Sequence, residues 1–170
     1  MLVIIDVTDP RHPRESGKLT FGSKKVEEFA FYEHYVYAAQ REEGVRIIDV
    51  ADPANPTLVG TFSTNAVGIA VQGNRAYVIE AGSTPIDWEY SNFLVIYDLG
   101  DPLNPVERGR TKVFRAREVI VSGEYAYTAG NFMGTYAGLR CIRVSDPTHP
   151  TVVDSALVNA NMGMLTWAVQ

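Results

Sequence analysis

The sequence is poor in the residues on which metal and disulfide sites are built: its 170 residues include one cysteine and three histidines. Because Cys141 is the only cysteine, neither an intrachain disulfide nor a cysteine-based zinc cluster can form. Long apolar runs are also missing, and none approaches the roughly 18 residues that a membrane-spanning helix needs. No basic segment followed by an apolar stretch and a cleavage site opens the chain. The sequence therefore predicts no membrane span and no signal peptide within these residues.

Long basic runs are absent as well. The longest basic run is Lys24-Lys25, and the net charge of the chain is -5. Such a charge repels a phosphate backbone, so we expect no nucleic-acid partner. Apolar residues make up 46% of the chain and charged residues 21%, which is the composition of a globular domain with a packed core.

Proline is concentrated in one repeated turn. The pattern Asp-Pro-x-x-Pro occurs four times and holds eight of the nine prolines. The copies stand at residues 9–13, 52–56, 101–105 and 146–150, separated by 43, 49 and 45 residues. Aspartate can accept backbone N–H bonds from the residues that follow it, and proline fixes φ at about −65°. Each copy is therefore expected to end one strand and begin another.

A short, nearly continuous apolar run precedes each turn. These runs lie at residues 2–7, 45–50, 94–99 and 139–144. Runs of this length, rich in β-branched residues and bounded by turns, are typical of strands buried on both faces. A less apolar strand follows each turn, with Gly17, Gly60 and Gly109 at one shared position, and suits the exposed edge of a sheet.

Two more strands, joined by a tight turn, complete each repeat. They lie at residues 68–72 and 75–79, and the pair recurs at 29–31 with 35–38 and at 118–121 with 125–128. Four antiparallel strands in such a period are typical of propeller blades. The predicted fold class is therefore all-β: a β-propeller-type array of four-stranded antiparallel blades, about three full blades plus partial terminal blades. We expect no long helix, and strand over at least half of the residues.

The order Leu-Val-Ile-Ile-Asp-Val-x-Asp-Pro-x-x-Pro, then glycine, then Val-x-Gly-x-x-Ala-Tyr-Val resembles the LVIVD repeat over essentially the whole chain. The resemblance implies a propeller-type fold. Proteins with this repeat are often exported, so it also implies a secreted or cell-surface location, but no particular activity. The fourth unit departs from the pattern, with Arg143 in place of aspartate and Asp154 in place of the glycine.

We expect residues 1–170 to be a single partial β-propeller. Its repeat units are approximately 1–44, 45–93, 94–138 and 139–170, the last of them truncated. Counted from inner to outer, the N-terminus supplies only the last two strands of a blade, the middle of the chain three whole blades and the C-terminus one inner strand. The chain is therefore expected to be a fragment. Open terminal blades would expose apolar faces, which makes self-association through them a further expectation.

Two loops, at residues 82–92 and 130–137, are much longer than their counterpart at residues 41–43. By analogy with other propellers, they lie at the end of the blades where loops enter the first strand and leave the second, the usual place for a ligand. The candidate ligand-binding residues at this end are Asp87, Trp88, Tyr90, Arg115, Phe132 and Tyr136. The alternative is that the aromatic side chains only pack over the blade tops and seal the scaffold.

Glu28 and Glu118 share one position on the innermost strands, with Gly68 between them. Two carboxylates that face a central channel can hold a cation or perform acid–base work. The alternative is that both are ordinary strand-end residues, with Glu118 paired to Arg117. All three histidines fall in turns and suggest no catalytic triad, so we predict no catalytic residue, no metal site and no cofactor.

Cys141 stands in the column of Ile4, Ile47 and Ile96, and we expect it to be buried and unreactive. The aspartates Asp6, Asp49 and Asp98 also form a column. One carboxylate per blade is too far from the next for a shared calcium ion, so a local turn bond accounts for them better.

The leading functional hypothesis is a non-catalytic binding or interaction module that recognises a protein or another extracellular ligand. One alternative is a metal-assisted hydrolase or lyase with its site in the central channel. Another is an intracellular protein-interaction scaffold.

Overall fold

The computed structural model describes residues 1–82, 91–132 and 136–159, which form fourteen β-strands in four antiparallel sheets. Sheet 1 contains β1 (Leu2–Asp6) and β2 (Arg14–Leu19). Sheet 2 contains β3 (Glu28–Tyr32), β4 (Tyr35–Ala39), β5 (Val45–Asp49) and β6 (Thr57–Phe62). Sheet 3 contains β7 (Ala66–Gln72), β8 (Arg75–Glu80), β9 (Ser91–Asp98) and β10 (Val106–Phe114). Sheet 4 contains β11 (Ala116–Ser122), β12 (Tyr125–Phe132), β13 (Tyr136–Arg143) and β14 (Thr151–Asn159).

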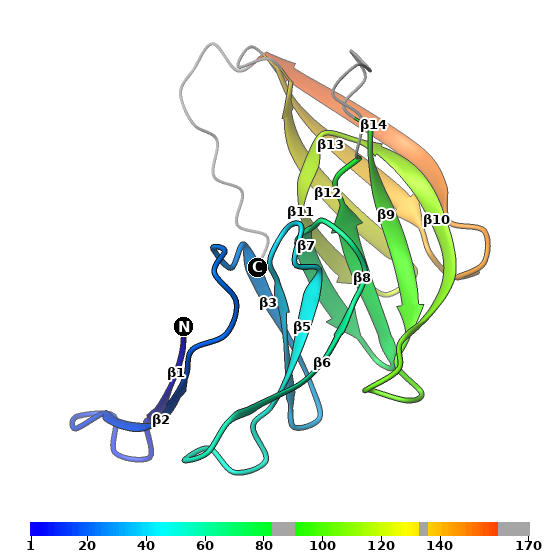
Figure 1. The fold of residues 1–170 in the computed structure, drawn as a ribbon. Coiled ribbons are helices and arrows are strands. Elements are labelled where there is room, and N and C mark those ends of the chain that lie inside the picture. The colour runs from blue at the N-terminus through cyan, green and yellow to red at the C-terminus, as the bar shows by residue number, and fades with distance from the viewer. Residues whose placement is uncertain (83–90, 133–135, 160–170) are drawn as a thin grey trace.

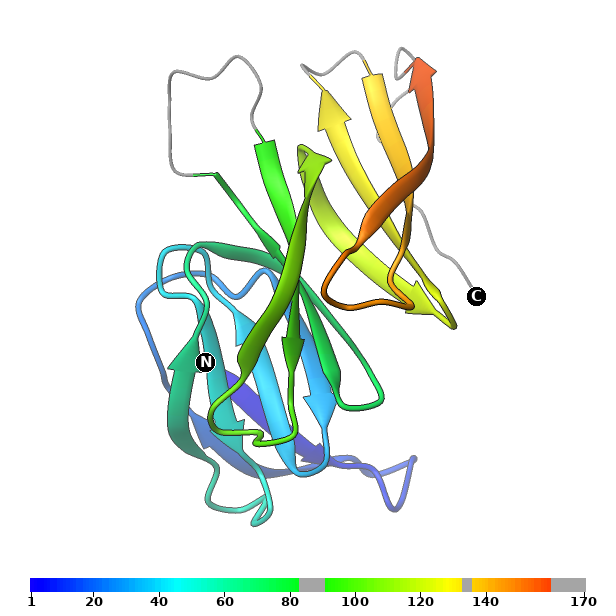
Figure 2. The same ribbon diagram turned by 90° about the vertical axis from the view of Figure 1, so that its right-hand side faces the viewer.

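Each four-stranded sheet runs in chain order from an inner to an outer strand. The inner strands β3, β7 and β11 contact one another in that order, while the outer strands spread away from them (Figures 1 and 2). No helix occurs in the described residues, and strands hold more than half of the chain. The predicted fold class is thus confirmed, with three four-stranded blades and one partial blade.

The Asp-Pro turns form as the sequence predicts. In every copy the aspartate Oδ1 accepts the backbone N–H two residues ahead, at 2.9 to 3.0 Å, and the fourth side chain of the turn bonds to Oδ2. These bonds hold the pKa of Asp9, Asp52, Asp101 and Asp146 below its usual range. The aspartates that share one position before the turns also form local hydrogen bonds. The Oδ1 atoms of Asp6, Asp49 and Asp98 each accept a hydrogen bond from the backbone N–H two residues further along the chain.

Neighbouring sheets bury apolar side chains between their faces. The core between sheets 2 and 3 includes Tyr37, Ile47, Ile69, Val78 and Val95. The core between sheets 3 and 4 includes Tyr77, Ile79, Leu94, Ile96 and Val119. Strands β5 and β9 supply both of their faces to cores, which explains why their sequences are apolar without alternation. The outer strand β6 is mostly exposed, as expected for an edge strand.

Two of the glycines that follow the turns make room for the next sheet, whereas a Cβ at Gly60 would lie 3.2 Å from the Ile47 side chain of its own sheet. A Cβ at Gly17 would lie 2.3 Å from the carbonyl oxygen of Pro53, and one at Gly109 would lie 2.6 Å from that of Pro147. Real Cβ atoms do not approach backbone oxygens so closely, so glycine is required where the turn of the next sheet docks. Asp154 occupies this position on sheet 4, where it pairs with Cys141.

The prediction that Cys141 is buried is wrong. The thiol is free and half-buried, whereas Ile47 and Ile96 in the same column are fully buried. The cause is the neighbourhood rather than the register. Ile96 faces sheet 4, whereas the face of sheet 4 that carries Cys141 points away from sheet 3 and includes exposed Ile120 and Leu139.

Candidate functional site

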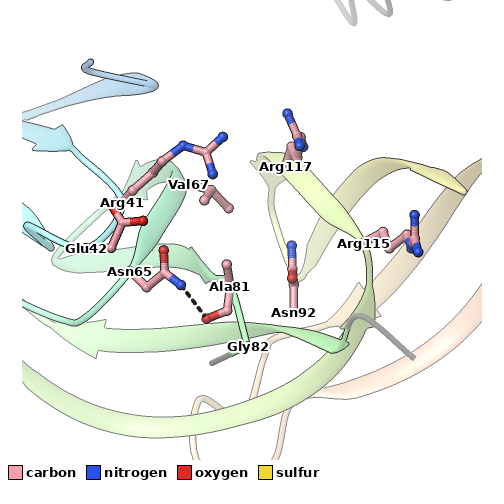
Figure 3. Close-up of a pocket in the computed structure, with 9 residues that line it drawn as sticks. All are labelled: Arg41, Glu42, Asn65, Val67, Ala81, Gly82, Asn92, Arg115 and Arg117. Carbon is pink, nitrogen blue, oxygen red and sulfur yellow. Dashed lines mark hydrogen bonds between the residues drawn. The ribbon is translucent and has the colours of Figure 1, made fainter. Parts of the chain in front are cut away.

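The described part of the loop face holds a pocket of about 340 Å³ (Figure 3). We use the name loop face for the end of the blades that carries the loops before β3, β7 and β11 and the loops after β4, β8 and β12. The polar residues that line the pocket are Arg41, Arg115, Arg117, Asn65, Asn92 and Glu42. Its remaining wall is formed by Val67, Ala81 and Gly82. We call it the arginine pocket, because three arginines and a single carboxylate residue are among those that line it.

The backbone of the pocket is held in an unusual conformation. Arg41, Asn65 and Arg115 all adopt positive φ angles, of 50°, 53° and 45°. Residues other than glycine reach this region at a cost of about 1–2 kcal/mol each, so the surrounding structure must impose it. At Arg41 the reason is visible: its N–H donates to Ala66 O at 2.7 Å, and Ala66 N–H donates back to Arg41 O at 2.9 Å. This bridge ties the loop of sheet 2 to the inner strand of sheet 3.

Two β-bulges supply neighbouring walls of the pocket. Strand β7 shifts register between Ala66 and Gly68, and β11 shifts between Ala116 and Glu118. The extra residues are Val67 and Arg117, which both line the pocket. A bulge re-aims one side chain without ending the strand, and such bulges are frequent beside functional sites.

Hydrogen bonds fix several of the lining side chains. Asn65 Nδ2 donates to Ala81 O at 3.1 Å, as Figure 3 shows, and Asn92 Nδ2 donates to Ala116 O. Arg41 Nε donates to Glu27 Oε1 at 2.6 Å. That bond is the main cause of the lowered pKa of Glu27. Arg117 is exposed and bonds to no residue in the described ranges.

The sequence predictions on the loop face meet the structure only in part. Arg115 lines the arginine pocket. Asp87, Trp88 and Tyr90 lie outside the described residues. Phe132 and Tyr136 pair across the ends of β12 and β13, but their side chains lie outside the description too.

Sequence reasoning missed Arg41, Arg117 and Asn92. The signal for Arg41 was its place in the short loop that corresponds to the two long ones. Nothing in the sequence indicates the bulge that turns Arg117 into the pocket.

Glu28 and Glu118 are brought near each other across Gly68. Glu28 Oε2 accepts the N–H of Ile69 at 2.7 Å and would lie 3.2 Å from a Cβ at Gly68. Burial raises the pKa of Glu28 to about 7, and the charge of nearby Glu118 adds to this effect, against the Ile69 hydrogen bond. Arg117 forms no ion pair with Glu118 in the described structure. The described residues contain no group of three His, Cys, Asp or Glu side chains arranged to hold a metal ion.

Other polar groups of the described structure have evident structural roles. Glu80 is almost fully buried and accepts hydrogen bonds from Ser63 Oγ at 2.6 Å and Tyr97 OH at 2.8 Å. A second cavity, of about 330 Å³, lies among the hairpin turns of sheets 3 and 4 at the opposite end of the blades. It is lined by one cation, Arg75, and one anion, Glu124, so it has no net charge comparable to that of the arginine pocket.

Blades of four antiparallel strands, set side by side through their inner strands, define a propeller-type repeat protein with a basic pocket on its loop face. A family model described as LVIVD repeat matches residues 1–20, 24–64 and 115–158. The chain therefore belongs to the LVIVD-repeat family, as the sequence motifs indicated. Residues 65–114 lie between two matched segments and form sheet 3, with the same strand order as its neighbours.

No curated protein sequence matches this chain. The described residues contain no helix with the length and apolar character needed to cross a membrane.

Proposed function

We propose that this chain is a non-catalytic binding module whose loop face holds the ligand, with the arginine pocket at its centre. The observation that carries the proposal is the convergence of three sheets on one pocket with three arginines and two asparagines. Guanidinium and amide groups recognise ligands well, but they are poor nucleophiles and poor general bases at neutral pH. Since the resemblance implies an exported protein, we expect the ligand to be extracellular.

The long loops supply further candidate residues for the proposed site. Gly82 and Asn92 both line the pocket, and the chain between them contains Asp87, Trp88 and Tyr90. Phe132 and Tyr136 belong to the other long loop of the same face. We keep these residues in the proposal as candidates for ligand contact.

A ligand panel tests this function. The full chain is screened by thermal unfolding against neutral, acidic and basic small molecules. A ligand at about 100 times its dissociation constant stabilises the protein by about 2.7 kcal/mol. We expect at least one ligand to stabilise the wild-type chain but not the Arg117→Gln variant. Mass spectrometry should recover that ligand chemically unchanged. A compound that the wild-type chain converts and Arg117→Gln does not would show that the module is catalytic. If every stabilising ligand also stabilised Arg117→Gln equally, the site would lie elsewhere.

The proximity of Glu28 and Glu118 favours a second candidate, a metal-assisted hydrolase or lyase with its site in the central channel. Metal analysis after dialysis against a divalent cation separates the two proposals. Stoichiometric metal that is lost in Glu28→Gln or Glu118→Gln would support the enzyme, and a metal-free wild-type chain would contradict it.

A further inference from the structure

Arg117 is the most available cation of the arginine pocket. It is exposed, it bonds to no described residue, and the bulge of β11 directs it toward the pocket. Arg41 lines the same pocket, and Figure 3 shows its guanidinium group standing apart from that of Arg117. Since Arg41 uses Nε for Glu27, its remaining guanidinium nitrogens stay available as donors. The two arginines therefore offer fork-shaped donors that suit the two oxygens of a carboxylate.

The asparagines add hydrogen-bond acceptors to these donors. Asn65 and Asn92 each use Nδ2 to bind a backbone carbonyl, which fixes the orientation of the amide. Each Oδ1 is left without a hydrogen bond to a described residue, and in Figure 3 the Oδ1 of Asn65 points away from Ala81. A fixed amide oxygen accepts a hydrogen bond from a hydroxyl group and repels an oxyanion.

The remaining features limit the charge and size of the ligand. Glu42 also lines the pocket, and the chain as a whole has a net charge of -5, so a densely charged polyanion is disfavoured. A volume of about 340 Å³ is at the low end of small-molecule sites. Val67 provides an apolar wall against which the carbon face of a ring can pack.

We infer that the arginine pocket binds a hydroxylated carboxylic acid of the sugar-acid class. Its carboxylate would bind Arg117 and Arg41, and its hydroxyl groups would donate to Asn65 and Asn92. This inference rests on the proposed binding function of the loop face and names the class of ligand. The bridge between Arg41 and Ala66 holds the site preformed, which lowers the entropic cost of binding.

Titration calorimetry with glucuronate tests the inference. Glucose, which lacks the carboxylate, acetate, which lacks the hydroxyl groups, and inorganic phosphate are the comparison ligands. We expect glucuronate to bind the full chain at least about tenfold more tightly than any of the three, since a charge-assisted hydrogen bond is stronger than a neutral one. Arg117→Gln should weaken glucuronate binding by about tenfold or more, and Arg117→Lys should weaken it less. Asn65→Ala should weaken glucuronate binding but leave acetate binding unchanged.

Arg11→Gln is the matched control, because Arg11 is an exposed arginine in a turn at the opposite end of the blades. It removes the same charge and should leave glucuronate binding unchanged. Circular dichroism verifies that each variant is folded; if Arg117→Gln is not, Arg117→Ala and Arg41→Gln provide the same comparison.

Three results would overturn the inference. Phosphate that binds as tightly as glucuronate would show a general anion site, glucose that binds as tightly would show that the arginines are not used, and equal binding by Arg117→Gln would place the ligand elsewhere. Absence of glucuronate binding also refutes the sugar-acid class. In each case the ligand panel decides the proposed function separately, because a pocket-dependent ligand of another class would preserve that function while this inference fails.

Discussion

Sheets 3 and 4 have the same four strands in the same order, but their equivalent apolar residues are buried to different degrees. Leu94 and Ile96 on sheet 3 have no exposed surface, whereas Leu139 at the equivalent position on sheet 4 is 38% exposed and Cys141 is half-buried. Sheet 3 lies between two sheets, and sheet 4 packs on one side only within the described residues. A blade-forming strand therefore obtains its stability from its neighbours as much as from its own sequence.

The largest expected effect is on matched leucines. Leu94→Ala should lower the free energy of unfolding by about 3–4 kcal/mol, because it leaves a cavity in the core between two sheets. Leu139→Ala should lower it by about 1 kcal/mol, because the side chain is already partly in water. Urea unfolding followed by circular dichroism measures both. Equal losses would show that the outer face of sheet 4 is covered in solution, for example by a second copy of the chain, and sedimentation analysis would identify that copy.

The position that follows the Asp-Pro turn also differs between sheets 3 and 4. Gly109→Ala should cost about 2–3 kcal/mol, because the new Cβ would lie 2.6 Å from Pro147 O. Asp154→Ala, at the same position on sheet 4, should change the stability by less than about 0.5 kcal/mol, since the described residues place no turn against it. Thermal unfolding of the two variants measures the difference. A large loss at Asp154 would indicate that this side chain has a partner besides the Ser155 N–H, whose hydrogen bond it accepts at 2.7 Å.

The two inner-strand glutamates differ in the same way. Burial raises the pKa of Glu28 from 4.5 to about 7, whereas Glu118 at the equivalent position of sheet 4 is exposed. Because the folded protein holds the proton more tightly than the unfolded chain, this contribution to stability is full below pH 4.5 and is lost as the pH rises through 7. Glu28→Gln should therefore stabilise the protein at pH 8 relative to pH 4, by on the order of 1 kcal/mol after solvent screening at this partly exposed group. Denaturant unfolding at several pH values gives the slope, and the same pH dependence in Glu28→Gln as in the wild type would contradict this assignment.

The smallest expected effect is on the reactivity of a thiol rather than on stability. Cys141 should react with a thiol reagent in the folded state, because it is half-buried on the open side of sheet 4. A cysteine introduced at the fully buried position of the same column, in Ile96→Cys with Cys141→Ser, should react at least about tenfold more slowly. Absorbance of the released chromophore without denaturant measures both rates. Similar rates would mean that both sides of sheet 4 are equally protected.

The local rules of this fold could be predicted from the sequence. The Asp-Pro turns and the antiparallel order of the strands depend on chemistry within a few residues, and the structure contains both. The repeated glycine is visible in the sequence, but at Gly17 and Gly109 the reason for it is the turn of the next sheet. The long loops pointed to the loop face, and Arg115 was found there. The bonding of Asp6, Asp49 and Asp98 to nearby N–H groups was also foreseeable, because it needs no other part of the chain.

The surfaces between blades depend on tertiary contacts that no local pattern in the sequence contains. The arginine pocket joins Arg41 of one blade to Asn65 of the next through a bridge of two backbone hydrogen bonds, and it takes Arg117 from a bulge that no pattern in the sequence indicates. The partial exposure of Cys141 also depends on tertiary structure, because no described sheet packs against the face of sheet 4 that carries it. A repeat sequence specifies what each blade is, since that depends on near neighbours along the chain, but the environment of a side chain at a blade surface depends on which blade, if any, packs against it.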